Sequence, residues 1–215
     1  MAESFELLPS LLRGAGVTLH LTVVSALFSL VLAFAAGLAR LSRFAVLRGL
    51  TAVYVEFFRG TSLLVQLFWL YFALPLLGIR LPAMAAAIIA LSLNFGAYGS
   101  EVVRGAIAAV PAGQTEAAIA LNMTPSQRLW RVILPQAFPM MLPAFGNQLI
   151  ELLKSTSLVS LITISDLTFH GVTLRTTTLR TTEVFTWLLI LYFIIAYGLT
   201  LGMRRLEKRY SAGRA

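Results

Sequence analysis

The chain has 215 residues, of which 58% are hydrophobic and 12% are charged, and its mean hydropathy is +0.84. A soluble domain usually carries about 25% charged residues, so this composition excludes an ordinary soluble protein and predicts one embedded in lipid. The absence of cysteine excludes disulfides and thiolate metal sites, and the net charge of +8 does not indicate nucleic-acid binding, because the basic residues gather at the ends of apolar segments.

Five apolar segments are each near or above the length of about 20 residues that a helix needs to cross a bilayer. They occupy residues 17–38, 53–77, 82–103, 136–164 and 184–203. We therefore predict an all-α membrane protein in which residues 1–215 form one transmembrane domain with about five spans. The first residues lack the basic stretch that opens a secretory signal peptide, so no cleaved leader is expected.

The second and third segments each carry an acid followed three residues later by a base. The pairs are Glu56 with Arg59 and Glu101 with Arg104, and this spacing places both charges on one helix face. Each pair is predicted to lie within about two helical turns of a cytoplasmic end. Two interpretations remain open: the arginines extend to the membrane surface, or the pairs act as a gate or in coupling.

The stretch Pro111–Pro135 is too amphipathic to cross a bilayer and predicts two short helices on the membrane surface. Thr115 is expected to cap the first helix, which should end at Asn122, a residue that tolerates a left-handed conformation. Residues 124–127 (Thr-Pro-Ser-Gln) form a capping-box pattern with proline at the first helical position. Pro135 is expected to stop the second helix.

The fourth segment carries a third acid–base pair, Glu151 and Lys154, which begins about fifteen residues into the span, or roughly 20 Å deep. Long side chains do not easily reach the surface from there, so the pair predicts a polar cavity. A purely structural ion pair is the alternative. Further polar residues at middle depth are expected to face the same solute path, namely Gln66, Asn94, Tyr98, Asn147 and Gln148.

The basic residues predict the orientation of the chain. The first, third and fifth segments are followed by Arg40, Arg43, Arg48, Arg104, Arg128, Arg131, Arg204, Arg205, Lys208 and Arg209. The opposite side begins with Glu3 and Glu6, and its later arginines, Arg175 and Arg180, are offset by acids. Because cytoplasmic loops carry the excess of basic residues, we expect the N-terminus outside and both the 111–135 stretch and the C-terminus in the cytoplasm.

The 111–135 stretch resembles the cytoplasmic EAA loop of permease subunits of ATP-binding-cassette (ABC) importers. That pattern is Glu-Ala-Ala, three residues, glycine, nine residues, then a hydrophobic residue, any residue, and Leu-Pro or a close variant. Here Asn122 stands in the glycine position. The resemblance implies that the loop docks into a cleft of an ATPase subunit through Glu116, Ala117, Ala118, Asn122, Leu134 and Pro135. An ordinary interfacial helix with an accidental Glu-Ala-Ala is the alternative.

Three further motifs are similar to those of polar-amino-acid permeases, at residues 56–66, 98–105 and 153–158. Within that branch, the chain looks most like permeases for ectoine and hydroxyectoine. The resemblance implies a permease for a small zwitterionic solute, either a polar amino acid or ectoine. We expect the carboxylate of the solute near Lys154 and its cationic part near Glu151.

The chain cannot supply its own energy. A P-loop needs Gly, four residues, Gly, Lys and Ser or Thr, but neither Lys154 nor Lys208 follows a glycine. The chain is therefore not expected to be an enzyme or to hold a cofactor, and ATP and magnesium should bind to a partner. The resemblance implies two ATPase subunits, a second permease subunit, identical or related, and an extracytoplasmic solute-binding protein at a bacterial cell membrane.

Other functional classes agree less well with the sequence. An ATP-independent secondary carrier or channel subunit could use the same charges, but five spans leave no inverted repeat within one chain. A passive assembly subunit would also fit the composition. A membrane protease is unsupported, because Ser100 lacks a nucleophile elbow and His20 and His170 have no dyad spacing.

Overall fold

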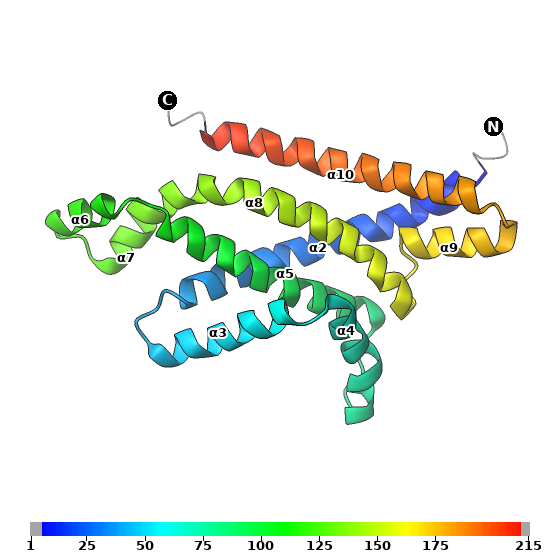
Figure 1. The fold of residues 1–215 in the computed structure, drawn as a ribbon, viewed down its shortest axis with the longest axis horizontal. Coiled ribbons are helices and arrows are strands. Elements are labelled where there is room, and N and C mark those ends of the chain that lie inside the picture. Colours follow the sequence, from blue (N-terminus) through cyan, green and yellow to red (C-terminus); the bar gives the residue numbers. More distant parts are fainter. Residues whose placement is uncertain (1–5, 212–215) are drawn as a thin grey trace.

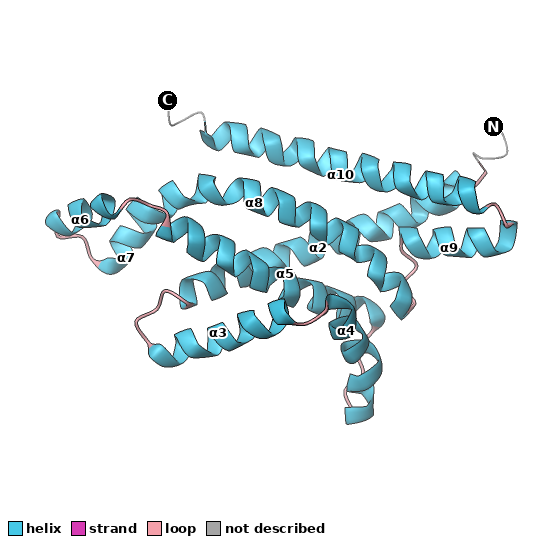
Figure 2. Ribbon diagram, in the orientation of Figure 1, coloured by secondary structure: helices cyan, strands magenta, loops and turns pink. Residues whose placement is uncertain are grey.

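The computed structural model describes residues 6–211, and the regular elements within them are all helical (Figures 1 and 2), which confirms the predicted all-α class. Glu3, part of the predicted acidic outer end, lies outside the described residues. The α-helices are α2 (Leu8–Ala39), α3 (Ala45–Gly60), α4 (Leu63–Phe68), α5 (Ala83–Ala108), α6 (Ala112–Ala120), α7 (Pro125–Gln127), α8 (Leu134–Ser155), α9 (Leu167–Thr178) and α10 (Thr181–Ser211). Short π-helical or 3₁₀ stretches extend three of them, over Trp69–Ala73, Leu74–Leu77, Arg128–Ile133 and Thr156–Ile162.

Among the described residues, α2, α5 and α10 are long and apolar enough to cross a membrane alone. Two bent pairs bring the number of candidate spans to as many as five. One pair joins α3 to residues 63–77 at an angle of 103°, and the other joins residues 125–162 to α9 at 53°. The predicted segments 17–38, 82–103 and 184–203 coincide with the three unbent helices.

The second predicted segment, residues 53–77, is not a straight span. The chain bends sharply after Gly60, and Thr61 and Ser62 are extended. The break frees the carbonyl of Phe58, which in lipid needs a protein partner. The side-chain amides of Gln66 and Asn94 donate to that oxygen at 3.1 and 2.9 Å, so they supply the hydrogen bonds that the broken helix no longer provides.

The core is centred on α2 and α5, which lie alongside each other over most of their length. Small residues permit this approach, as they often do between membrane helices. A Cβ added to Gly99 would lie 2.7 Å from the Cβ of Ala33, and one added to Gly37 would lie 2.7 Å from that of Val103. These close contacts fix the position of α5 against α2.

Helix α9 is an element that the sequence analysis did not predict. Its N-cap is Asp166, a buried carboxylate whose oxygens accept hydrogen bonds from the backbone N–H groups of Phe169 (2.9 Å) and Thr168 (3.2 Å). The hydroxyl of Thr18 on α2 accepts from the N–H of Leu167 at 3.1 Å. These bonds fix the start of α9 on α2.

Helix α6 is followed by the left-handed Asn122, as predicted, but it does not begin at Thr115. Asn122 has a φ of +53°, and the N–H of Met123 reaches the carbonyl of Ala118 at 3.0 Å, as in a Schellman turn. The capping prediction for Thr115 is wrong, because α6 already begins at Ala112 after the extended Pro111. Proline suits the start of a helix, since the first turn needs no N–H donor there.

The second helix of the 111–135 stretch begins as predicted but does not end at Pro135. Thr124 and Gln127 form both bonds of the capping box, at 3.3 and 2.9 Å. The helix then continues through the π-helical stretch Arg128–Ile133 into α8. Pro135 lies in the first turn of α8, directly after the wider π-helical turns, where its missing N–H breaks less of the regular bonding. The predicted surface helix is therefore an N-terminal extension of the fourth segment.

Candidate functional site

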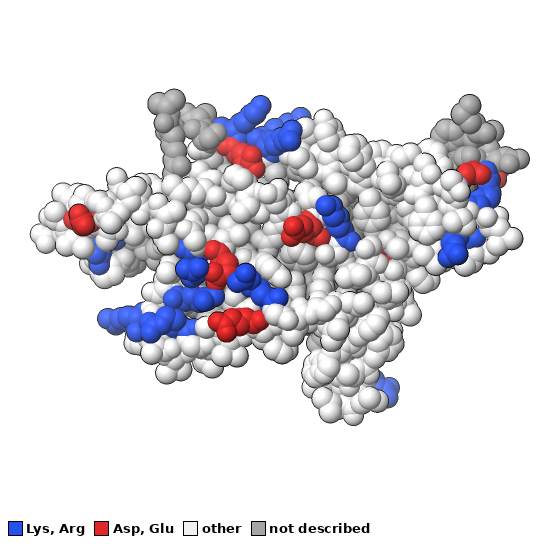
Figure 3. All heavy atoms as spheres, in the orientation of Figure 1, with Lys and Arg blue, Asp and Glu red and all other residues white. Residues whose placement is uncertain are grey.

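A cavity of about 450 Å³ lies between the α3–α4 break, α5 and α8. Its lining residues are Thr61, Ser62, Leu63, Asn94, Phe95, Tyr98, Glu151, Lys154 and Ser155. Four of the seven residues predicted for the solute path thus meet at one cavity. In Figure 3 an acidic and a basic group lie side by side over the middle of the molecule, away from the basic clusters at its ends.

Glu151 and Lys154 both present exposed side chains at this cavity. Within the described part of the chain, neither forms an ion pair within 4.0 Å, whether with the other or with a third residue. The alternative of a purely structural ion pair therefore finds no support. Two opposite charges, three residues apart on α8, remain available to a molecule in the cavity.

The amides of Gln66 and Asn94 have a structural task. Gln66 is only 8% exposed and does not line the cavity, and its Nε2 also donates to the hydroxyl of Thr61 at 2.7 Å. Asn94 does line the cavity, but its Nδ2 donates to Phe58 and, at 3.2 Å, to the Oε1 of Gln66. Both residues therefore shape the cavity wall by holding the broken helix.

The structure places the two remaining predicted path residues outside this cavity. Gln148 donates through Nε2 to the carbonyl of Phe95, and its Oε1 is buried without a partner among the described residues. Asn147 is exposed one turn before Glu151, so Asn147, Glu151 and Lys154 form one stripe along α8. Lipid cannot satisfy such a stripe, which indicates that this face of α8 meets water or protein.

The Glu56–Arg59 pair was predicted within about two helical turns of the start of its span, but the structure places it further along the helix. Helix α3 begins at Ala45, so the two residues lie eleven and fourteen positions into it, or about 16 and 21 Å along its axis. No ion pair joins them within the described residues. The guanidinium of Arg59 instead lies 5.3 Å from the ring centroid of Tyr98, a cation–π contact at the edge of the cavity.

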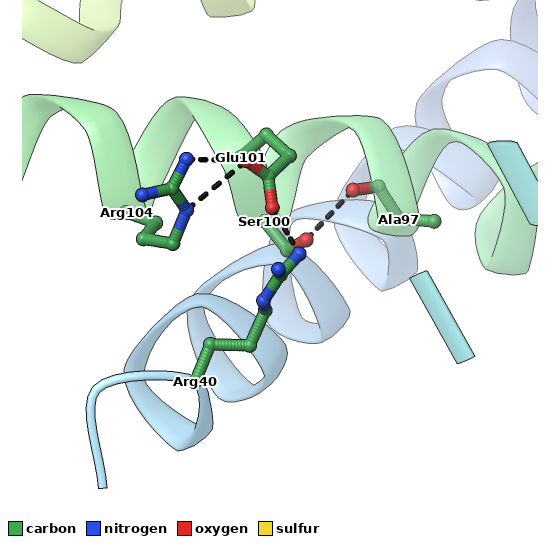
Figure 4. A network of polar contacts seen from close by, with 5 residues as sticks. All are labelled: Arg40, Ala97, Ser100, Glu101 and Arg104. Atoms are coloured by element: carbon green, nitrogen blue, oxygen red, sulfur yellow. Dashed lines mark hydrogen bonds and ion pairs between the residues drawn. The ribbon is translucent and has the colours of Figure 1, made fainter. Parts of the chain in front are cut away.

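The Glu101–Arg104 pair forms as predicted and includes a third residue that the sequence analysis missed. Arg104 donates from Nε and Nη2 to Glu101 at 3.0 and 2.8 Å, and Arg40, at the end of α2, donates to the other carboxylate oxygen (Figure 4). Parallel packing of the first and third segments, which both end on the same side of the bundle, would have pointed to Arg40. The network ties together the C-terminal ends of α2 and α5.

The residues that the resemblance assigned to ATPase docking do not all lie on one surface. Glu116, Ala117, Asn122 and Pro135 are exposed, and Leu134 is half-buried. Ala118 is only 2% exposed, and its carbonyl closes the Schellman turn. Ala118 therefore supports the α6 surface from beneath and cannot itself contact a partner.

Comparison with known sequences identifies the family. The profile of the binding-protein-dependent transport system inner membrane component matches residues 19–212. A probable amino-acid ABC transporter permease of Sinorhizobium fredii is 51% identical over 201 residues, which cover 91% of this chain and 84% of that protein. The glutamine transport system permease of Escherichia coli is 35% identical over 204 residues, covering 94% and 93%. The L-cystine transport system permease of Bacillus subtilis is 44% identical over 158 residues, covering 74% and 68%.

Solved structures give the same answer. The crystal structure of an amino acid ABC transporter with histidines has a chain that superposes with a TM-score of 0.91 at 33% identity, covering 97% of both chains. A chain of the inward-facing methionine ABC transporter MetNI superposes with a TM-score of 0.80 at 26% identity, covering 94% of this chain and 96% of that one. These matches do not favour a secondary carrier or channel. The chain belongs to the binding-protein-dependent inner membrane components and is the non-catalytic permease subunit of an ABC importer.

Proposed function

We propose that this permease carries a small zwitterionic solute whose carboxylate binds near Lys154 and whose cationic group binds near Glu151. The observation that carries the proposal is that both charges line one cavity without pairing with each other. Charge-assisted contacts of this kind are strong where water is scarce. The names of the relatives, which refer to amino acids, L-cystine and glutamine, support a polar amino acid as the class.

Ectoine is the narrower prediction from the sequence resemblance. It has one carboxylate and a delocalised cationic ring, so it matches the same pair of charges as an amino acid does. The cavity volume of about 450 Å³ lies within the usual range of about 300–1,000 Å³ for small-molecule sites and admits either solute. Ectoine therefore belongs in the panel of test solutes beside glutamine, histidine and cystine.

Membership of this family implies an ATPase and a solute-binding protein as partners. We infer in addition a second permease subunit, identical or related, and two ATPase subunits, with ATP and magnesium bound on those subunits. The exposed polar stripe of α8 supports the second permease, because lipid cannot cover it. The basic cytoplasmic ends support an external N-terminus and a cytoplasmic C-terminus.

The test uses the complete importer in proteoliposomes, with its solute-binding protein and each solute of the panel. Glu151→Gln and Lys154→Met should each lower uptake about tenfold or more, since a hydrogen bond to a charged group contributes about 1.5–3 kcal/mol. Glu183→Gln and Arg80→Met remove an acid and a base that do not line the cavity, so they serve as controls. Unchanged uptake and apparent affinity in both cavity variants would show that the assignment is wrong.

A further inference from the structure

A second cavity lies on the other side of α8, between that helix, α2 and α10. Its volume is about 340 Å³, and thirteen of its sixteen lining residues are apolar. We refer to it as the α2–α8–α10 groove. The donors of its three polar residues all bond to backbone carbonyls: Thr22 to Thr18 at 2.8 Å, Ser29 to Ala26 at 2.9 Å, and Gln148 to Phe95. The lining is therefore predominantly apolar, with its polar side chains bonded to the backbone, and suits an apolar chain.

The dimensions of the groove distinguish between possible occupants. Along α8 it extends from Phe138 to Leu152, fourteen residues or about 21 Å. A whole helix of that length and about 10 Å in diameter occupies roughly 1,600 Å³, so a groove of about 340 Å³ cannot enclose one and would hold only part of its surface. One leaflet of the hydrocarbon core is about 15 Å thick. The groove is therefore long enough to hold a single acyl chain of one leaflet.

The cytoplasmic end of the groove carries positive charge. Phe138 and Leu206 line this end, and α10 continues there into a basic run that includes the exposed Arg205 and Arg209. Figure 3 shows basic groups gathered where α10 ends. At about 100° per residue, Arg209 lies about 90° around the helix from the lining stripe, and Arg205 lies beyond it on the same side.

The acidic group at this end lies on the other flank of α10. Glu207 is about 70° from the lining stripe in the opposite sense, where its Oε1 would be 3.6 Å from a Cβ added to Gly146 of α8. The carboxylate thus faces the α8 contact, and Arg205 and Arg209 lie on the opposite flank of α10. This arrangement is complementary to an anionic headgroup above an apolar chain.

We propose that the α2–α8–α10 groove binds an anionic phospholipid of the cytoplasmic leaflet. One acyl chain lies along α8, and the phosphate group interacts with Arg205 and Arg209, as basic pockets between membrane helices do with lipid headgroups. A zwitterionic lipid places the same chain in the groove but brings no net charge to the arginines. The bound lipid fills the space behind α8, the helix that carries Glu151 and Lys154 on its opposite side.

The direct test measures lipid retained by the purified importer, using native mass spectrometry after extraction from phosphatidylethanolamine vesicles that contain phosphatidylglycerol. Each arginine near an anionic surface contributes a factor of about five to affinity. The double variant Arg205→Gln with Arg209→Gln should therefore bind phosphatidylglycerol about 30-fold more weakly. The control, Arg43→Gln with Arg48→Gln, removes two exposed charges of residues that do not line the groove and should retain the lipid.

A second variant fills the groove without touching the charges. Leu30 lines the groove and is 41% exposed, so Leu30→Trp should exclude the acyl chain without disturbing the core. Val31→Trp, at the next position, is 67% exposed, does not line the groove and serves as the control. Retention in all four variants equal to that of the parent would overturn the proposal, as would a crosslink showing a second permease copy in the groove.

Discussion

At the scale of single residues, Glu101 has the most consequential position outside the cavity. Its carboxylate accepts from Arg104 on its own helix and from Arg40 on α2, sixty-one positions earlier in the chain. All three groups lie near the end of the bundle where α2 and α5 both terminate. One carboxylate thus holds two helix ends together, and its loss leaves two guanidinium groups facing each other.

This arrangement predicts that Arg40 and Glu101 depend on each other. Arg40→Gln should destabilise the permease by about 1 kcal/mol, and Glu101→Gln by more, because the glutamine amide cannot neutralise either arginine. The measurement is the apparent Tm of the purified importer for both single variants and the double variant. The double variant should lose less than the sum of the single losses. Additive losses would contradict a direct contact between the two side chains.

At the scale of elements, α6 and the turn at Asn122 present the surface that resembles an ATPase-docking loop. The burial of Ala118 changes which substitutions can test docking. A large side chain at Ala118 would disrupt the turn itself, whereas Glu116 and Ala117 are exposed and can be changed without loss of the fold. Exposed positions of α6 therefore separate docking from folding.

Glu116→Lys and Ala117→Trp should each lower solute-stimulated ATPase activity at least about fivefold, because a residue central to an interface contributes more than about 1 kcal/mol. Leu47→Trp, an exposed position on α3, is the control for a bulky substitution outside this surface. The readout is ATP hydrolysis by the assembled importer with and without loaded solute-binding protein. Full stimulation in both α6 variants would exclude this surface as the contact.

The sequence could predict elements whose determinants are local. The left-handed residue Asn122 and the Thr124–Gln127 capping box depend on neighbours within a few positions, and both are confirmed. Features that depend on distant partners were missed. At the break after Gly60, the free carbonyl of Phe58 accepts a hydrogen bond from Asn94, more than thirty positions later. The start of α9 depends on a hydrogen bond to Thr18, at a sequence separation of 149.

The same distinction applies to the candidate site. The spacing of Glu151 and Lys154 and their predicted depth pointed to a polar cavity, and both residues line one. The sequence could not separate residues that face the cavity from residues that build its wall. Gln66, for example, is polar and at middle depth, but its amide donates hydrogen bonds to a carbonyl and a hydroxyl group at the break in the helix.

At the scale of the whole molecule, the chain is one part of an ATP-driven assembly. Uptake by the reconstituted importer should therefore be abolished by vanadate, and the permease alone in liposomes should show no solute accumulation. A solute gradient imposed across the same liposomes is the control for passive leakage. Uptake that persists in vanadate, or accumulation by the permease alone, would contradict energy coupling through a separate ATPase.

The helical run from Pro125 to Ile162 is continuous, so a movement at one end is transmitted to the other. From Pro125 to Lys154 it extends over 29 positions, or about 44 Å. A tilt of about 5° at the Pro125 end would move the other end by about 4 Å, more than the length of a hydrogen bond of about 3 Å. A small rotation imposed on the 111–135 stretch would therefore be sufficient to make or break contacts between a solute and Lys154.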